Sequence, residues 1–211
     1  MRTKTDAKRE VLLAAAAATF KEKGFEGTSM SEICARAGGS KATLYNYFPS
    51  KEALLLEVMF RESEADLLRT LQALQSLDDD VATALRNFGQ RMLGMLYAPH
   101  VMAARRLLVA QAGRADLGKR CYQQGPMRSF ACVGQFLQQA MDRGLLRSAD
   151  TLLAARHLQA LLEAELMSGF MFQHVPSPDA QQIAMCTDRA VDAFMRLYAP
   201  VCAGSCLTSN T

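Results

Sequence analysis

Residues 29–48 have the sequence SMSEICARAGGSKATLYNYF. Ser29 is followed three residues later by Glu32, and this capping box predicts that a helix begins at residue 30. Gly38 can take the left-handed conformation that ends a helix, and Ser40 can cap a second helix directly after it. The pattern predicts two short helices joined by a glycine turn, which is a helix-turn-helix.

The second of these helices, which Pro49 ends, carries little apolar surface. Leu44 and Phe48 are its clear core residues, and its outer faces carry Lys41, Thr43, Tyr45, Asn46 and Tyr47. A helix fits the major groove of DNA, where lysine and hydroxyl groups donate to phosphate and asparagine reads a base edge. The alternative is an ordinary helical hairpin with a polar outer face.

The same region resembles the TetR/AcrR family of transcriptional regulators. Its signature runs through FEGTSMSEICARAGGSKATLYNYFPSKEALL, from Phe25 to Leu55. Gly39 departs from the family pattern, which more often has valine there, and we expect a looser turn or a small gap beneath the recognition helix. The resemblance implies contacts with operator DNA. We expect phosphate contacts from Thr28, Ser40, Thr43, Tyr45, Tyr47 and Lys51, and base contacts from Lys41, Ala42 and Asn46.

The remaining chain predicts an all-α protein. A first helix from Thr5 to Lys23 should cover the helix-turn-helix and bury Leu13, Phe20, Ile33, Leu44 and Phe48 with it. A long helix follows from Lys51 to about residue 75, and glycines, prolines and acidic residues delimit helices near 80–97, 100–112, 127–143, 150–173 and 178–199. We expect a DNA-binding domain at 1–50, a helical ligand-binding and dimerisation domain at 51–200, and a disordered tail at 201–211.

The helix expected at 150–173 is apolar around most of its circumference, so it needs two burial partners. The pattern alone fits the centre of a monomeric core equally well. TetR-like proteins form a four-helix dimer interface from their last two long helices, and the resemblance therefore favours a homodimer. The interface residues expected on this basis are Leu158, Leu162, Leu166, Thr187, Val191, Phe194 and Tyr198.

The chain has twelve methionines, ten phenylalanines and no tryptophan, an apolar inventory that can repack around varied ligands. Such residues at helical spacing also suit a plain core. The family resemblance implies an inducer cavity in the C-terminal helices, and the stretch from Arg105 through Gly125 to Asp150 resembles the AefR-like type of C-terminal domain. We expect a mainly hydrophobic ligand lined by Met92, Met95, Leu96, Met102, Leu107, Phe130, Val133, Phe136, Leu137, Met167, Phe170 and Met171.

Several function classes lack support in the sequence. The net charge of +3, from 24 basic and 21 acidic residues, is too small to indicate a partner by itself. No apolar run is long enough to span a membrane, and no signal peptide is evident, so we expect a cytoplasmic protein with reduced cysteines. Cys202 and Cys206 lack a second ligand pair, and the histidines are isolated, so we expect no metal, cofactor or catalytic residue. A redox role for Cys121 or Cys132 stays open without positive support.

These patterns together predict a homodimeric transcriptional regulator, most simply a repressor that a ligand releases from its operator. Two rival interpretations come from other classes. One is a helical enzyme that binds small molecules, which would need a convergent polar constellation. The other is a protein-interaction adaptor whose helix-turn-helix no longer binds DNA.

Overall fold

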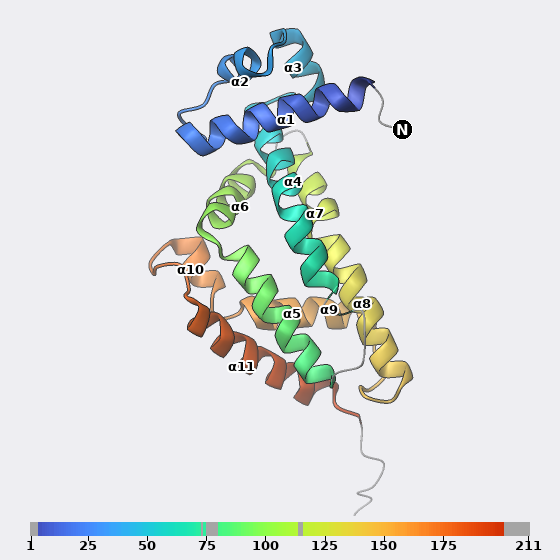
Figure 1. The fold of residues 1–211 in the computed structure, drawn as a ribbon. Coiled ribbons are helices and arrows are strands. Elements are labelled where there is room, and N and C mark those ends of the chain that lie inside the picture. The colour runs from blue at the N-terminus through green and yellow to red at the C-terminus, as the bar shows by residue number, and fades with distance from the viewer. Residues whose placement is uncertain (1–3, 73, 75–79, 114–115, 201–211) are drawn as a thin grey trace, which may run out of the picture. The chain divides into compact units, whose positions relative to one another are not determined.

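The computed structural model describes residues 4–72, 74, 80–113 and 116–200 (Figure 1). Throughout these ranges every regular element is a helix, which confirms the all-α prediction. The helices are α1 (Lys4–Lys23), α2 (Met30–Ala37), α3 (Lys41–Tyr47), α4 (Lys51–Gln72), α5 (Val81–Leu96), α6 (Pro99–Gln111), α7 (Leu117–Gln124), α8 (Pro126–Asp142), α9 (Thr151–Glu163), α10 (Met167–Phe172) and α11 (Ala180–Tyr198). The predicted tail at 201–211 lies outside the described residues.

The chain folds into two compact units. The first comprises Met1–Leu67 and Ala98–Met127, and the second comprises Leu68–Tyr97 and Arg128–Thr211. Helices α6 and α7 join the first unit because Leu108 and Leu117 pack against Ala53 and Leu56 of α4. The expected functional division at residue 50 stays a prediction.

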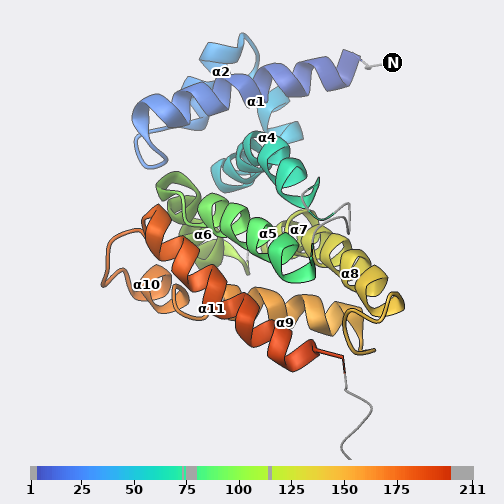
Figure 2. The same ribbon diagram turned by 60° about the horizontal axis from the view of Figure 1, so that its bottom comes forward.

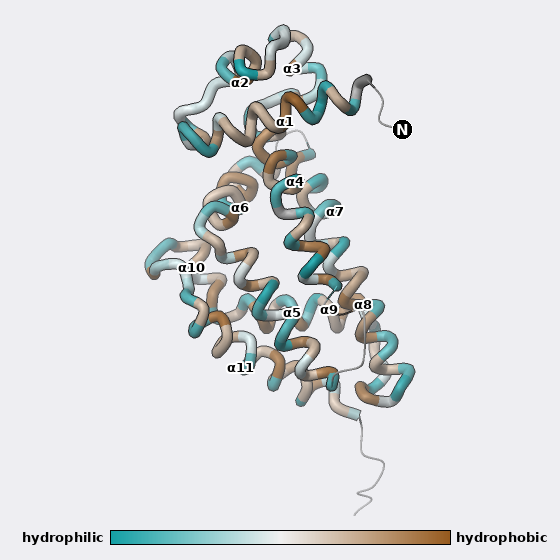
Figure 3. Tube along the Cα trace, viewed as in Figure 1, coloured by the Kyte–Doolittle hydropathy of each residue, from teal (hydrophilic) through white to brown (hydrophobic). Residues whose placement is uncertain are grey.

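The core of the first unit forms where α1 meets α2, α3 and the start of α4. Figure 3 shows a hydrophobic middle and a hydrophilic C-terminal end in α1. The core contains all five residues predicted for it, with Phe20 partly buried and Leu13, Ile33, Leu44 and Phe48 buried. At the end of α1, Gly24 has a φ of 69° and Phe25 stacks on Phe20 with ring centroids 5.9 Å apart. A left-handed glycine and an aromatic contact across it thus end α1.

In the second unit, α11 lies against both α5 and α9 (Figure 2). The helices pack tightly at Gly89 of α5, where an added Cβ would lie 2.7 Å from Leu162 Cδ2 and 2.8 Å from Thr187 Cγ2. No larger residue fits there without a shift of its neighbours. Phe136, Leu137 and Phe194 are among the largest fully buried side chains of this unit.

Two helix predictions were wrong. The helix expected at 150–173 is broken, because α9 ends at Glu163 and α10 begins at Met167. Hydrogen bonds of the i to i+3 type tighten the chain at the break, and Glu165 there binds Arg189 of α11 at 2.6 and 2.8 Å. Helix α7 was missed because Leu117 is its one buried residue, which leaves almost no periodic signal.

Candidate DNA-binding surface and ligand cavity

The turn between α2 and α3 has the predicted geometry. The capping box at Ser29 is complete, since Glu32 N–H donates to Ser29 Oγ and the Glu32 carboxylate accepts from Ser29 N–H. Gly38 ends α2 with φ 63° and ψ 56°, in the left-handed region. Ser40 then caps α3 by accepting a hydrogen bond of 3.1 Å from Thr43 N–H. The helix-turn-helix prediction is therefore confirmed at the level of backbone geometry.

Gly39, the departure from the family pattern, leaves no gap beneath α3. A Cβ at this position would lie 3.3 Å from the Nζ atom of Lys8, which donates to the Gly38 carbonyl oxygen at 3.2 Å. Cys34 Sγ also donates to the Gly39 carbonyl oxygen at 2.8 Å. The α1 lysine therefore occupies the space that a larger residue would fill.

Helix α3 has one anchored face and one exposed face. Leu44 and Phe48 are buried, whereas Thr43 and Tyr47 are half-buried. The exposed face carries a cation, an amide, a phenol and a small side chain, contributed by Lys41, Asn46, Tyr45 and Ala42. These four are all among the residues predicted to contact DNA. The arrangement leaves hydrogen-bond donors and acceptors on the side of the helix that could enter a groove.

Two predicted phosphate contacts are turned inward. The Thr28 side chain is buried, and its hydroxyl donates to the carbonyl oxygens of Gly24 at 2.7 Å and Thr19 at 3.4 Å. Lys51 Nζ donates to the carbonyl oxygens of Phe25 at 2.8 Å and Thr28 at 3.0 Å. Direct phosphate binding by the Thr28 hydroxyl does not fit this geometry. The Thr28 hydroxyl instead ties the loop between α1 and α2 to the end of α1, and Lys51 holds the same loop against the start of α4.

An open hollow lies between the starts of α2 and α4. It has a volume of about 520 Å³ and is lined by Thr28, Ser29, Met30, Ser31, Tyr45, Pro49, Ser50 and Lys51. Helix N-termini attract anions because their first N–H groups point outward and the helix dipole is positive there. The sequence-based list missed Ser31 and Ser50. Their position at the starts of α2 and α4 was the sequence signal that could have identified them.

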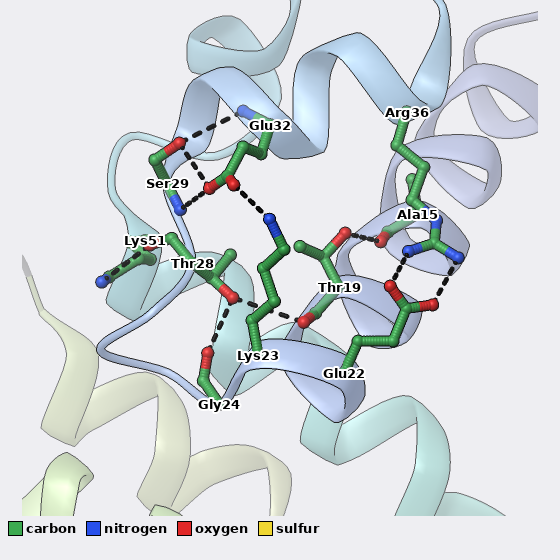
Figure 4. A network of polar contacts seen from close by, with 10 residues as sticks. All are labelled: Ala15, Thr19, Glu22, Lys23, Gly24, Thr28, Ser29, Glu32, Arg36 and Lys51. Atoms are coloured by element: carbon green, nitrogen blue, oxygen red, sulfur yellow. Dashed lines mark hydrogen bonds and ion pairs between the residues drawn. The ribbon is translucent and has the colours of Figure 1, made fainter.

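A network of charged residues surrounds the start of α2 (Figure 4). Lys23 Nζ donates to the Glu32 carboxylate at 2.5 Å, and the hydrogen bond from Lys23, followed by those from Ser29, lowers the pKa of Glu32 to about 2. Arg36 pairs with both oxygens of Glu22 at 2.7 Å and lowers the pKa of that carboxyl. These pairs link the end of α1 to α2.

Glu57 of α4 joins three helices of the first unit. Its carboxylate accepts hydrogen bonds from Arg9 of α1 and from Arg120 of α7. The Glu57 side chain is 11% exposed, so solvent screens these ion pairs less than it screens surface pairs. The Arg9 guanidinium also lies 5.6 Å from the centre of the Phe48 ring. One carboxylate thus connects the helix that covers the helix-turn-helix with α4 and α7.

The second unit contains a small cavity between α5, α8 and α9. Its volume is about 20 Å³, and its lining is Phe88, Met92, Leu93, Leu96, Ser129, Phe130, Val133, Ala155, Leu158, Gln159, Leu162 and Glu163. This is room for one water molecule, whereas a cavity that holds benzene has about 150 Å³. Any larger ligand must therefore displace side chains as it enters.

A carboxylate lies in the wall of this apolar cavity. Glu163, at the end of α9, is 4% exposed. Its Oε1 atom accepts a hydrogen bond of 3.2 Å from the Tyr97 hydroxyl, and its Oε2 atom accepts one of 3.1 Å from the Gln159 amide. A carboxylate that is this deeply buried needs several such donors, because burial removes it from water. Ser129 and Gln159 are the other polar side chains of the lining.

The cavity contains four of the predicted pocket residues, which are Met92, Leu96, Phe130 and Val133. The other predictions do not line it. Met102 and Leu107 belong to the first unit, Phe136, Leu137 and Phe170 are buried elsewhere in the second, and Met95, Met167 and Met171 lie away from the lining. Sequence reasoning missed Glu163, Gln159 and Ser129. The signal was an acidic residue one helical turn after Gln159 in a mainly apolar helical run.

The predicted dimer residues lie on the inner face of their helices. Leu158, Leu162, Thr187, Val191, Phe194 and Tyr198 are at most 3% exposed within a single chain, and Leu166 is half-buried. This assignment was wrong because helical periodicity identifies an apolar face and cannot tell which neighbour covers it. Large apolar side chains that do remain exposed on these helices are Leu152, Leu153, Met185 and Leu197.

The structure also bears on metal binding, cysteine reactivity and membrane spans. In the described ranges, no group of three or more His, Cys, Asp or Glu residues is placed to hold a metal ion. Cys202 and Cys206 lie outside those ranges. Burial raises the pKa of the Cys121 thiol, which disfavours the reactive thiolate. No described helix has the length and apolar character needed to cross a bilayer.

Two family models match the chain. Residues 12–58 match the model for bacterial regulatory proteins of the tetR family, and residues 83–200 match the model for the C-terminal domain of AefR-like transcriptional repressors. The second match alone covers more than half of the chain. The first match includes the helix-turn-helix, and the second includes the residues that line the cavity.

Curated relatives and solved structures agree with these models. The chain is 33% identical to the regulator UidR of Escherichia coli K12 over 100 residues, which are 44% of this chain and 51% of UidR. It thus spans about half the length of this relative. It is 49% identical to RutR of the same strain over 53 residues, 25% of each chain.

The structural matches cover nearly the whole chain. A TetR-family transcriptional regulator from Mesorhizobium loti MAFF303099 is 30% identical, with a TM-score of 0.79 over 93% of this chain and 99% of the other. The flavonoid-responsive regulator FrrA is also 30% identical, with a TM-score of 0.71 over 92% of this chain and 98% of the other. This chain therefore belongs to the TetR family of transcriptional regulators, with a C-terminal domain of the AefR-like type.

Proposed function

We propose that this protein is a cytoplasmic, DNA-binding transcriptional repressor that acts as a homodimer and leaves its operator when a small ligand binds the second unit. The observation that carries the proposal is the exposed face of α3. It presents Lys41, Ala42, Tyr45 and Asn46, while Leu44 and Phe48 fix the opposite side in the core. A short helix held in this way is suited to the major groove.

The proposed contacts divide by chemistry. Lys41, Ala42 and Asn46 face the bases, and the hydroxyls of Tyr45 and Tyr47 reach phosphates on either side. The starts of α2 and α4, with Ser31 and Ser50, form a further phosphate site. Ser40 and Thr43 set the beginning of α3 through their shared hydrogen bond of 2.9 Å.

The proposed dimer uses the outward faces of α9 and α11. Leu153 of α9 and Met185 of α11 are 49% and 48% exposed, and large exposed apolar patches indicate interaction sites. A two-fold dimer places two recognition helices in successive major grooves, so we expect a pseudo-palindromic operator with half-sites roughly 34–36 Å apart or somewhat more.

The proposed ligand site is the cavity of the second unit. Its aromatic and methionine side chains suit a mainly apolar molecule. The similar protein FrrA is flavonoid-responsive, which supports a ligand-responsive role for this chain as well. Ligand and DNA affect each other through linkage, so operator DNA should weaken ligand binding by the same factor as ligand weakens operator binding.

Fluorescence anisotropy with the DNA directly upstream of the gene tests the DNA-binding proposal. Lys41→Ala should weaken binding and reduce the salt slope by about one unit. Lys119→Ala is the matched control, because Lys119 is exposed on α7 of the same unit. Equal affinity and equal salt slope for the wild type and Lys41→Ala would contradict the proposed surface. Specific DNA binding would also exclude the adaptor interpretation.

A further inference from the structure

The Lys8 side chain of α1 lies against the turn of the helix-turn-helix. Its Nζ atom donates to the Gly38 carbonyl oxygen at 3.2 Å, and its Nζ and Cε atoms lie 3.3 and 3.6 Å from the place where a Cβ of Gly39 would be. Lys8 is half-buried, whereas its hydrogen bond is exposed. The aliphatic part of the side chain therefore covers the turn, and the ammonium group stays at the surface.

The ammonium group of Lys8 has hydrogen-bonding capacity left. A lysine side chain carries three N–H donors and a full positive charge. Across the described ranges, the Gly38 oxygen is the one hydrogen-bond partner of Lys8 Nζ, and no acidic side chain pairs with it. Arg9, the next residue, instead binds the Glu57 carboxylate. Two N–H groups of Lys8 thus remain for a ligand, and the charge favours an anion.

This ammonium group lies close to the start of α3. Gly38 and Gly39 lead directly to Ser40, which caps the helix, and Lys41 begins its exposed face. When a helix enters a groove of DNA, backbone phosphates lie at the edges of that groove, and lysines bind them. The hydrogen bond to Gly38 restricts the Lys8 side chain in advance, which lowers the entropy that the side chain loses on binding.

The backbone conformation does not explain why residue 39 is glycine. The φ of Gly39 lies outside the left-handed region, unlike that of Gly38. A larger side chain at this position would meet the end of Lys8 and push it away from the Gly38 oxygen. The Cys34 thiol donates to the Gly39 carbonyl oxygen at 2.8 Å and so ties this part of the turn to α2. Glycine at position 39 therefore gives Lys8 the room to reach the turn.

We propose that Lys8 is a phosphate anchor of the DNA-binding surface, contributed by α1 and not by the helix-turn-helix, and that Gly39 gives it access to this position. Lys8 keeps its hydrogen bond to Gly38 and donates its remaining N–H groups to a backbone phosphate beside the start of α3. This inference rests on the proposed function and extends its contact surface to α1. Phosphate contacts carry no sequence information, so Lys8 should strengthen binding to operator and to unrelated duplex DNA alike.

Fluorescence anisotropy with the upstream DNA, repeated across a range of salt concentrations, tests the anchor. Lys8→Met keeps an apolar side chain of similar length and removes the charge. This variant should reduce the salt slope by about one unit and weaken binding about fivefold near 0.15 M salt, the effect expected from one counterion. Lys21→Met is the matched control, because Lys21 is exposed on the same helix, on a face turned by roughly 140° from that of Lys8.

The control separates a local contact from the general effect of net charge, since both variants lose one positive charge. Lys21→Met should leave the salt slope close to that of the wild type. Equal losses in Lys8→Met and Lys21→Met would overturn the inference. Circular dichroism checks that each variant is folded.

Gly39→Val tests the access to the turn. The larger side chain displaces Lys8, so Lys8→Met should lower the salt slope by about one unit in the wild-type background and by much less in the Gly39→Val background. Gly39→Leu, whose side chain is not branched at Cβ, takes its place if Gly39→Val does not fold. An undiminished effect of Lys8→Met in the folded variant would overturn the role of Gly39.

The same titrations distinguish this inference from the proposed function. Failure of the wild type to bind either operator or unrelated duplex DNA would refute the proposed function. If the wild type bound DNA and Lys8→Met bound it with the same affinity and the same salt slope, the anchor alone would be refuted.

Discussion

Adjacent glycines in the turn between α2 and α3 provide a matched test of the backbone argument. Gly38 has a φ of 63°, and no atom lies within 4 Å of the place where its Cβ would be. Alanine at this position therefore meets only the backbone penalty of the left-handed conformation, about 1–2 kcal/mol. We expect Gly38→Ala to lower the free energy of unfolding by that amount.

Gly39 should respond in the opposite direction. Its φ is outside the left-handed region, and its added Cβ would meet only the far end of the Lys8 side chain, at 3.3 Å from Nζ. Alanine there reduces the conformational freedom of the unfolded chain, which stabilises the folded protein by about 0.4–1 kcal/mol. Displacement of the hydrogen bond from Lys8 would reduce this gain. The two alanine variants should differ by about 1.5–3 kcal/mol.

Urea unfolding followed by circular dichroism measures this difference, provided that the dependence of the free energy on urea is the same in both variants. A Gly38→Ala protein as stable as the wild type would refute the left-handed turn. If Gly39→Ala were less stable than Gly38→Ala, then Gly39 and not Gly38 would be the position of the turn that requires glycine.

Three further outcomes are expected. Glu57→Gln should lower the free energy of unfolding by about 1–3 kcal/mol, because it weakens two partly buried ion pairs; thermal melts against wild type measure this, and an unchanged midpoint would contradict it. The stability that Glu32 contributes should be present above about pH 4.5 and lost as the pH falls towards its folded pKa of about 2. Glu32→Gln should therefore flatten the acid dependence of the free energy of unfolding. An NMR titration that gives Glu32 an ordinary carboxyl pKa would contradict this prediction. Leu153→Glu should give a folded monomer in sedimentation velocity, whereas Phe194→Glu should unfold the chain because Phe194 is fully buried; a dimeric Leu153→Glu protein would exclude this interface.

Local sequence signals predicted the helix-turn-helix because every step of it is a short-range interaction. The capping box at Ser29, the left-handed Gly38 and the cap at Ser40 each involve residues within four positions of one another. Periodicity also identified the core between α1 and α3. Such interactions depend little on the rest of the chain, so residue type and spacing were sufficient to predict them.

The prediction failed where the outcome depends on distant partners. Thr28 was expected at phosphate, yet its buried hydroxyl donates to the carbonyl oxygen of Thr19 nine positions earlier. Phe194 was expected at a dimer interface, yet its own chain covers it completely. Both errors have one cause: a sequence pattern shows which side chains need a partner, and the tertiary fold decides which partner each one finds.

The small size of the cavity bears on how a ligand could control DNA binding. A volume of about 20 Å³ admits no molecule larger than water, so this cavity does not fit an inducer in the arrangement described here. An inducer must bind a wider arrangement, and its apparent affinity falls by the fraction of molecules that adopt this arrangement without it. If operator DNA binds the narrow arrangement more tightly, then this arrangement lowers the affinity for the inducer and raises the affinity for the operator.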